Sequence, residues 1–377
     1  MHLPRRSFFR AGAAAAAFGS FARIRARGNE DRIRVGFVGI GGRGSHHLRT
    51  VMSFPFVDVA AVCDIREEAC ARAQSALVQA GREKPAAYDD YRKLLERADL
   101  DSVVNATPPD CHARQYLDTL AAGKDLYGEK PMCITPEECD AVVAAAEKSK
   151  NHLLVGFQGR YSPRNREGVR RIHAGDLGEV MEMHSAYLAS FGPLRGWQST
   201  RARSGDWAVE QAVHFFDLMN WLFKGTAAAA FGWGRKDVFT DGEPGRDVTD
   251  YYAALLKYPG GVIVNWQHSW LRPKGGVFDG VRHQVLGRKG GIDLEKGIVN
   301  YTDAGRAAEQ LPADGGDPTK LAHADLFECI RSGKTPFSNA VNGRDSVLVA
   351  LLVREAADRG ACVTFEELFG RARAKER

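Results

Sequence analysis

The sequence predicts an α/β protein of two domains, and three observations support this. At 377 residues the chain is longer than a typical single domain. Residues 33–38 form a short β-prone run that is followed at once by a glycine-rich loop and a helix-like segment. The apolar runs at residues 57–62 and 100–106 are also short, as buried parallel strands are. We place the first domain at residues 31–156 and the second at residues 157–377.

The charge of the chain is concentrated near its start. The formal net charge is +5, and residues 1–30 contain six arginines and one glutamate, which also sum to +5. The rest of the chain is therefore formally neutral. A nucleic-acid-binding domain is expected to keep a basic face on its folded part, so we do not expect a nucleic-acid partner.

The first thirty residues have the pattern of a twin-arginine signal peptide. The basic run Pro-Arg-Arg-Ser-Phe-Phe-Arg at residues 4–10 precedes an apolar, alanine-rich run at residues 11–22. That run is shorter than the ~20 residues that a membrane-spanning helix needs. We expect the twin-arginine machinery to export the folded protein to the periplasm, anchored to the membrane if the leader is retained. The alternative is a disordered basic tail or an amphipathic anchor.

No metal site is expected from the sequence. The seven cysteines are scattered, are odd in number and include no Cys-x-x-Cys pair, so we interpret them as mostly buried thiols. His46-His47 and His214-x-x-Asp217 resemble ligand pairs, but neither brings a third ligand.

The glycine-rich loop has the G-x-G-x-x-G pattern of a Rossmann dinucleotide-binding domain. We expect Gly39 to form the tight turn, Gly41 to admit the pyrophosphate and Gly44 to let the helix pack on the strand. The N-terminus of the following helix would attract the phosphates. The residues of this predicted cofactor loop are Gly39, Ile40, Gly41, Gly42, Arg43 and Gly44.

An acid at the end of the second predicted strand indicates which dinucleotide is bound. Asp64 lies 20 residues after Gly44, which is the spacing at which an acid receives a ribose 2′-hydroxyl. Its charge would repel the 2′-phosphate of NADP, so we expect NAD. Arg66 is two residues further on and could reduce that preference.

Two further segments lie where ligands bind in an open α/β sheet, beyond the carboxyl ends of its strands. Thr107, Pro108 and His112 follow the strand expected at residues 100–106. Glu129 and Lys130 end another expected strand, and a lysine at such a place can be desolvated and act in acid–base chemistry.

A helix-like run at residues 207–222 supplies an acid and a histidine four residues apart. Residues at this spacing share a helix face, so Glu210 and His214 are expected to lie side by side. A carboxylate beside an imidazole holds its tautomer and raises its basicity. The alternative is that His214 is a core histidine in an apolar helix.

Together these motifs resemble the Gfo/Idh/MocA family of oxidoreductases, from about Arg32 to the C-terminus. The resemblance implies a Rossmann domain followed by an α/β domain whose open mixed sheet carries the substrate site and often mediates oligomerisation, so we expect a homo-oligomer. It also implies that Lys130, which matches the lysine of the family's Glu-Lys-Pro motif, contacts the reacting sugar hydroxyl. The chain departs from the family at Glu210, where many members have aspartate, and in the segment before it.

The expected site residues follow from these motifs and from the resemblance. Lys130, His214 and Glu210 are the catalytic candidates. Cofactor contacts are expected from the glycine loop and from Asp64, Thr107, Pro108, His112, Glu129 and Lys130. Substrate contacts are expected from Arg160, Tyr161, Asn165, Trp207 and Gln211.

The predicted activity is hydride transfer between a sugar or polyol carbinol and NAD. In this hypothesis His214 accepts the hydroxyl proton, Glu210 orients His214, and Lys130 polarises the oxygen. An exported enzyme is not expected to meet a pool of free NAD(H), so the cofactor is expected to be tightly held. The alternatives are an NAD-dependent glycosidase or lyase that oxidises, eliminates and re-reduces its substrate, and a non-catalytic sugar or nucleotide sensor.

Overall fold

The first domain is built on a six-stranded parallel sheet. In the computed structural model, which describes residues 32–370 apart from 240, 272 and 274–277, the strand order is β3-β2-β1-β4-β5-β6. The order reverses between β1 and β4, and ligands bind at such a switch point. The strands are β1 (Ile33–Val38), β2 (Val57–Cys63), β3 (Ala86–Tyr88), β4 (Ser102–Asn105), β5 (Asp125–Gly128) and β6 (Leu153–Val155).

Helices connect these strands, as parallel pairing requires. β1 and β4 are almost wholly buried, because the sheet is covered on both faces. The helices of this domain are α1 (Gly42–Met52), α2 (Glu67–Gln79), α3 (Tyr91–Leu95), η1 (Pro109–Cys111), α4 (His112–Ala121) and α5 (Pro136–Lys148).

The second domain contains a nine-stranded sheet with the order β14-β13-β12-β11-β7-β10-β9-β8-β15. β7 and β10 pair in parallel and the other neighbours are antiparallel, so the sheet is mixed, and the predicted fold class is confirmed. Its strands are β7 (Val180–Leu188), β8 (Ala229–Arg235), β9 (Tyr251–Lys257), β10 (Ile263–Ser269), β11 (Gly280–Gly287), β12 (Gly290–Asp293), β13 (Ile298–Tyr301), β14 (Glu309–Gln310) and β15 (Val363–Thr364).

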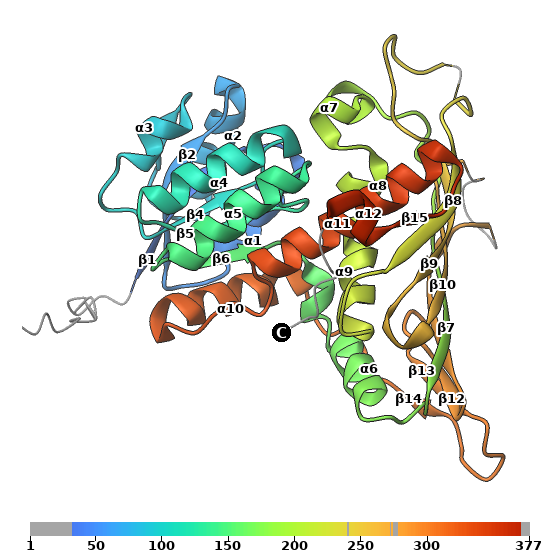
Figure 1. The fold of residues 1–377 in the computed structure, drawn as a ribbon. Helices are drawn as coiled ribbons and strands as arrows, with labels where there is room; N and C mark the ends of the chain where they lie inside the picture. The colour runs from blue at the N-terminus through green and yellow to red at the C-terminus, as the bar shows by residue number, and fades with distance from the viewer. Residues whose placement is uncertain (1–31, 240, 272, 274–277, 371–377) are drawn as a thin grey trace, which may run out of the picture. The chain divides into compact units, whose positions relative to one another are not determined.

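Of the remaining helices, α8, α9 and α11 lie on one face of the second sheet, and α10 lies against the first domain (Figure 1). α11 packs against α9, β8 and also α5 of the first domain. The remaining helices are η2 (Gln158–Tyr161), α6 (Pro163–His173), η3 (Gly196–Ser199), α7 (Arg201–Ser204), α8 (Trp207–Glu210), α9 (Val213–Leu222), η4 (Pro259–Gly261), α10 (Pro318–Ser332), α11 (Ala340–Arg359) and α12 (Phe365–Phe369).

Helix α10, orange in Figure 1, belongs spatially to the first domain although it lies late in the chain. It contacts α1 and β5, and its residues Ala322, Leu326 and Phe327 are buried in the same apolar cluster as β1. Along the chain, α10 lies within residues 157–377, the range expected for the second domain, while in space it packs with the first sheet. No side chain of α10 was expected near the nucleotide site.

The helix expected at residues 207–222 is interrupted, which corrects that prediction. α8 ends at Glu210 and α9 begins at Val213, because the amide of Ala212 bonds to the carbonyl of Trp207 and not to that of Ala208. This wider turn breaks the regular i, i+4 ladder. Glu210 and His214 therefore do not belong to one continuous helix.

The predicted signal peptide, residues 1–30, lies outside the described residues. Within the described part of the chain, no helix has both the length and the apolar content that crossing a membrane demands.

Candidate active site

A cavity of about 810 Å³ lies at the switch point, beyond the carboxyl ends of β1, β2 and β4. Both domains contribute to its wall. The first domain supplies the glycine loop, Asp64 and Thr107, and the second supplies α8, α9 and the η3–α7 segment. A cavity of this size at a switch point is typical of a dinucleotide and a small substrate.

The glycine loop has the geometry that the motif predicts. Gly39 has φ +85°, and a Cβ there would lie 2.8 Å from the backbone of Ala106. A Cβ on Gly44 would lie 1.9 Å from the carbonyl oxygen of Gly39. Gly42, in contrast, has nothing within 4 Å, so the N-terminus of α1 faces open space. These residues fit a pyrophosphate held by backbone N–H groups.

Asp64 closes the far side of this loop. Its Oδ2 accepts a hydrogen bond from the backbone N–H of Ile40 at 2.8 Å, and its Oδ1 accepts from the N–H of Arg66 at 3.0 Å. The guanidinium of Arg66 lies 3.3 Å from the same Oδ1. Asp64 lines the cavity, where it is placed to meet a ribose, while the side chain of Ile40 is buried in the core.

The loop after β4 is divided between the cavity and the protein interior. Thr107 and Pro108 line the cavity as expected. His112 does not, because its ring is buried with one nitrogen 2.7 Å from the carbonyl oxygen of Pro131 and the other 2.8 Å from that of Thr107. It joins two loops of the site and is out of reach of a ligand in the cavity.

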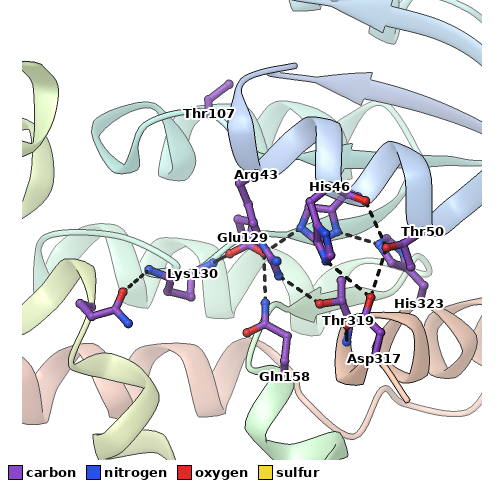
Figure 2. A network of polar contacts seen from close by, with 12 residues as sticks. Arg43, His46, Thr50, Thr107, Glu129, Lys130, Gln158, Asp317, Thr319 and His323 are labelled. Atoms are coloured by element: carbon purple, nitrogen blue, oxygen red, sulfur yellow. Dashed lines mark hydrogen bonds and ion pairs between the residues drawn. The ribbon is translucent and has the colours of Figure 1, made fainter. Parts of the chain in front are cut away.

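Glu129 is the centre of a buried polar network (Figure 2). Its carboxylate accepts hydrogen bonds from Nε of Arg43 at 2.7 Å, Nε2 of His47 at 2.8 Å and the backbone N–H of Lys130 at 3.0 Å. Nε2 of Gln158 donates a fourth at 3.3 Å. Burial alone would raise the pKa of Glu129, but Arg43 and these donors together lower it well below its ordinary value.

Lys130 reaches across the cavity to the second domain. Its Nζ donates to the backbone carbonyl of Glu210 at 2.6 Å and lies 3.2 Å from Oε1 of the same residue. Oε1 of Gln211 is 3.5 Å away, at the edge of hydrogen-bonding distance. All three residues line the cavity, so the ammonium is held at a fixed point of its wall.

His214 also lines the cavity, and its ring meets Phe157 edge-on. The expected pairing of Glu210 with His214 is replaced by the pairing of Glu210 with Lys130, because the break between α8 and α9 separates the acid from the imidazole. Burial, followed by the nearby Lys130 cation, lowers the pKa of His214 to about 3. The imidazole is therefore neutral at physiological pH, and the burial that keeps it neutral also makes it a weaker base than an exposed histidine.

Four of the five expected substrate residues have partners elsewhere, and only Gln211 lines the cavity. The chain after β6 turns through η2 into the interior, where Nε of Arg160 contacts both carboxylate oxygens of Asp217. The hydroxyl of Tyr161 donates to Asp325, and the side-chain amide of Asn165 donates to the carbonyl of Gly159. The indole N–H of Trp207 donates to Nε2 of His268. Substrate contact by Arg160, Tyr161, Asn165 and Trp207 is therefore not supported.

Other cavity residues carry no motif that a single sequence could reveal. Trp197 and Gln198 on η3 and Arg203 on α7 line the side of the cavity formed by the second domain. Nε of Arg203 donates to Oδ2 of Asp110 at 3.0 Å, which joins α7 to η1. Within the described residues, no group of three or more metal-ligating side chains occurs.

Comparison with known proteins agrees with this architecture. Residues 33–157 match a model described as an oxidoreductase family with an NAD-binding Rossmann fold, and residues 166–293 match the GFO/IDH/MocA C-terminal domain. A solved oxidoreductase domain protein from Kribbella flavida is similar with a TM-score of 0.78 and 22% identity, over 89% of this chain and 99% of that one. Levoglucosan dehydrogenase in complex with NADH gives a TM-score of 0.78 at 21% identity, with the same coverage. These likenesses concern the fold.

Curated relatives include glycosidases. A glycosyl hydrolase family 109 protein of Shewanella baltica is 33% identical over 183 residues, which are 47% of this chain and 39% of the relative. An alpha-N-acetylgalactosaminidase of Shewanella oneidensis is 32% identical over 181 residues, 46% of this chain and 39% of that protein. The aligned part thus spans about two fifths of the length of these relatives. With both domain models matched in order along the chain, this protein belongs to the Gfo/Idh/MocA family.

Proposed function

We propose that the protein is an NAD(H)-dependent oxidoreductase that acts on the CH–OH group of a sugar or polyol. One observation supports this above the others. A cation, Lys130, and a neutral imidazole, His214, line the same cavity as the glycine loop and Asp64. This combination is what removal of a hydroxyl proton beside a dinucleotide requires.

The cofactor, when bound, supplies the hydride chemistry. The chain's own residues manage the hydroxyl group. Lys130 donates an N–H to the substrate oxygen and stabilises the negative charge that develops there, while the neutral ring of His214 accepts the proton. Glu210 does not orient His214 in this mechanism. Its carbonyl and carboxylate hold Nζ of Lys130 in place, so Glu210 acts as a positioning residue.

The charges that face the substrate end of the cavity are paired. Lys130 pairs with Glu210 and Arg203 pairs with Asp110. The neutral hydrogen-bonding side chains Gln198 and Gln211 and the indole of Trp197 lie in the same wall. Such a surface suits an uncharged polyhydroxylated ligand, which offers hydroxyl groups to amides and C–H faces to an aromatic ring.

A second candidate function is an NAD-dependent glycosidase or lyase. The identity of 33% to a glycosyl hydrolase family 109 protein favours it. Transient oxidation of a sugar carbon acidifies the neighbouring C–H, so an aglycone can be eliminated. In a glycosidase water then adds to the unsaturated ketone before the carbonyl is reduced again, and in a lyase it does not. The cycle consumes no net cofactor, which agrees with tightly held NAD.

The experiment that separates these functions begins with the purified protein. It is denatured and any released nucleotide is identified by mass, and the native protein is then offered free polyols, aldoses and aryl glycosides. NADH accumulation with a free sugar supports the dehydrogenase, and aglycone release without net NADH supports the glycosidase. Lys130→Met should abolish whichever activity is found, and unchanged activity in this variant would contradict both enzymatic proposals.

We also propose that the protein is exported by the twin-arginine pathway, on the basis of the arginine pair and apolar run in residues 1–30. Replacement of Arg5 and Arg6 with lysine is expected to keep the protein in the cytoplasm. Cell fractionation of the two forms tests this. Equal export of both would contradict it.

A homo-oligomer is proposed as well. Three large apolar side chains on the neighbouring strands β8, β9 and β10, Trp233, Leu255 and Ile263, are each at least 42% exposed, and Leu286 on β11, beyond β7, is 39% exposed. An apolar sheet face of this kind is typical of a subunit interface. The mass of the protein in solution by light scattering tests this, and a monomer at micromolar concentration would contradict it.

A further inference from the structure

The buried pair His47 and His323 has no part in the mechanism above, yet it adjoins the site. Nδ1 of His47 lies 2.8 Å from Nε2 of His323, and neither side chain is exposed. His47 comes from α1 and His323 from α10, which are 276 residues apart in the chain. The ring of Tyr127 stacks on His323 and meets His47 edge-on, so the pair is held from the side of β5.

The hydrogen bonds determine the tautomers of both rings. The carboxylate of Glu129 can only accept, so Nε2 of His47 carries a proton. Burial lowers the pKa of His47 and of His323, so both rings are neutral and Nδ1 of His47 is an acceptor. Nε2 of His323 must then donate to it. The two histidines form a directed chain of donors that ends on Glu129.

Glu129, which accepts the hydrogen bond from His47, also binds two groups of the cavity wall. Its Oε1 also holds Nε of Arg43, whose side chain is 37% exposed and lines the cavity in the first turn of α1. Its Oε2 holds the backbone N–H of Lys130. Nη2 of Arg43 has one more neighbour, Oγ1 of Thr319 on α10, at 3.5 Å. Figure 2 shows α10 reaching the network with Asp317, Thr319 and His323.

We propose that His47 and His323 are positioning residues of the nucleotide site, which through Glu129 fix Arg43 beside the phosphate-binding turn and Lys130 beside the substrate. Helix α10 is thereby part of the cofactor-binding machinery, although it lies outside the Rossmann sequence. The inference rests on the proposed binding of NAD(H). When a buried carboxylate loses one hydrogen-bond donor, its interactions with the remaining donors become stronger. Glu129 would then hold Arg43 more tightly, and Arg43 would be less available to a phosphate of the cofactor.

The test compares matched variants of the full-length protein. His47→Leu and His323→Leu remove the donor chain, His47→Gln keeps an N–H that can reach Glu129, and His283→Leu is the control. His283 is a buried histidine of β11 that bonds to Ser185 and does not line the cavity. The measurements are the dissociation constant of NADH by energy transfer from tryptophan, the melting temperature, and kcat and KM wherever turnover is detected.

We expect NADH to bind about 10-fold more weakly to His47→Leu and at least threefold more weakly to His323→Leu, with His47→Gln within threefold of the wild type. His283→Leu should lower the melting temperature and leave NADH binding unchanged. If His47→Leu does not fold, His323→Leu decides the question, because without the N–H of His323 the proton of His47 is no longer fixed on Nε2, the nitrogen that donates to Glu129. The inference would be overturned if both leucine variants bound NADH within twofold of the wild type and melted at a lower temperature. The two histidines would then contribute to packing only. A wild-type protein that releases no nucleotide on denaturation and also binds no added NADH would instead overturn the proposed function itself.

Discussion

Nζ of Lys130 lies 2.6 Å from the backbone carbonyl of Glu210 and 3.2 Å from its carboxylate, so a residue of the first domain is fixed by a residue of the second. Both side chains are about nine-tenths buried, and a buried cation without a partner is costly. An aspartate at position 210 would be one methylene shorter and would withdraw the carboxylate from Nζ.

Lys130→Met is expected to lower kcat by at least ~10²-fold, because the substrate oxygen loses its cationic donor. NADH binding should change little, since the backbone N–H of residue 130 still reaches Glu129. Glu210→Asp keeps the backbone carbonyl and withdraws only the carboxylate, so we expect a loss of about 10-fold or less. Steady-state kinetics measure both, with the exposed Lys150→Met as the control. A larger loss in Glu210→Asp than in Lys130→Met would contradict this assignment.

The pH dependence of kcat/KM tests the role of His214. Its pKa is lowered to about 3, first by burial and then by Lys130, so the ring stays unprotonated as the pH falls through the ordinary histidine range. Oxidation should therefore show no acid limb near pH 6.5 from this residue. His214→Asn should lower kcat by about 10²-fold or more at every pH. An acid limb near pH 6.5 that disappears in His214→Asn would contradict the lowered pKa.

The glycine loop offers a matched pair of substitutions. A Cβ at Gly44 would lie 1.9 Å from the carbonyl of Gly39, so Gly44→Ala must displace α1 from β1. We expect it to lower the free energy of unfolding by about 2 kcal/mol or more, as overpacking does. Gly42→Ala meets nothing within 4 Å and should be neutral or slightly stabilising. Chemical denaturation of both proteins measures the difference, and equal losses would mean that α1 does not depend on close approach at Gly44.

Much of the first domain could be predicted from the sequence because its signals are local. The strand–glycine–helix pattern, Asp64 and Lys130 each depend on residues within about 20 positions, and the structure brings all of them to one cavity. The break between α8 and α9 could not be predicted, since residues 207–222 contain no glycine or proline to mark it, and it depends on one wide turn at Ala212.

Long-range contacts explain the other differences. Arg160 seemed suited to a substrate, yet its charge is neutralised by Asp217 from a helix more than fifty residues away. His323 gave no signal, because the donor chain to His47 exists only once α10 has packed against α1. A single sequence records which residues are present at such places but not which partner each of them meets.

Selection between NAD and NADP is expected to depend on Asp64 and Arg66. Asp64→Ser removes the charge that repels a 2′-phosphate and frees the guanidinium now 3.3 Å away. NADP should then bind about 10-fold more tightly than it binds the wild type, and NAD more weakly. Adding Arg66→Ala to this variant should abolish the gain. If Asp64→Ser weakens both cofactors equally, the carboxylate serves mainly to hold the N–H of Ile40, at 2.8 Å, and does not select the cofactor.

The stability of the folded protein at low pH is expected to depend on one specific contact. Nε2 of His268 accepts a hydrogen bond from the indole N–H of Trp207, which can only donate, so the ring must stay unprotonated there. Burial lowers the pKa of His268 to about 3 in the folded state, against about 6.5 in the unfolded chain. The unfolded state therefore binds more protons below pH 6.5, and the stability present above that pH is lost as the pH falls towards 3.

At pH 5 the loss amounts to about 2 kcal/mol from this one residue, from 1.36 kcal/mol for each pKa unit. The melting temperature should fall from pH 7.5 to pH 5. The fall should be smaller in His268→Phe, whose ring can still pack among Tyr187, Trp207 and Trp270. His173→Phe is the control, because that histidine is an exposed residue at the end of α6. An equal fall in the wild type and in His268→Phe would mean that His268 is protonated inside the folded protein, and that Trp207 donates its N–H elsewhere.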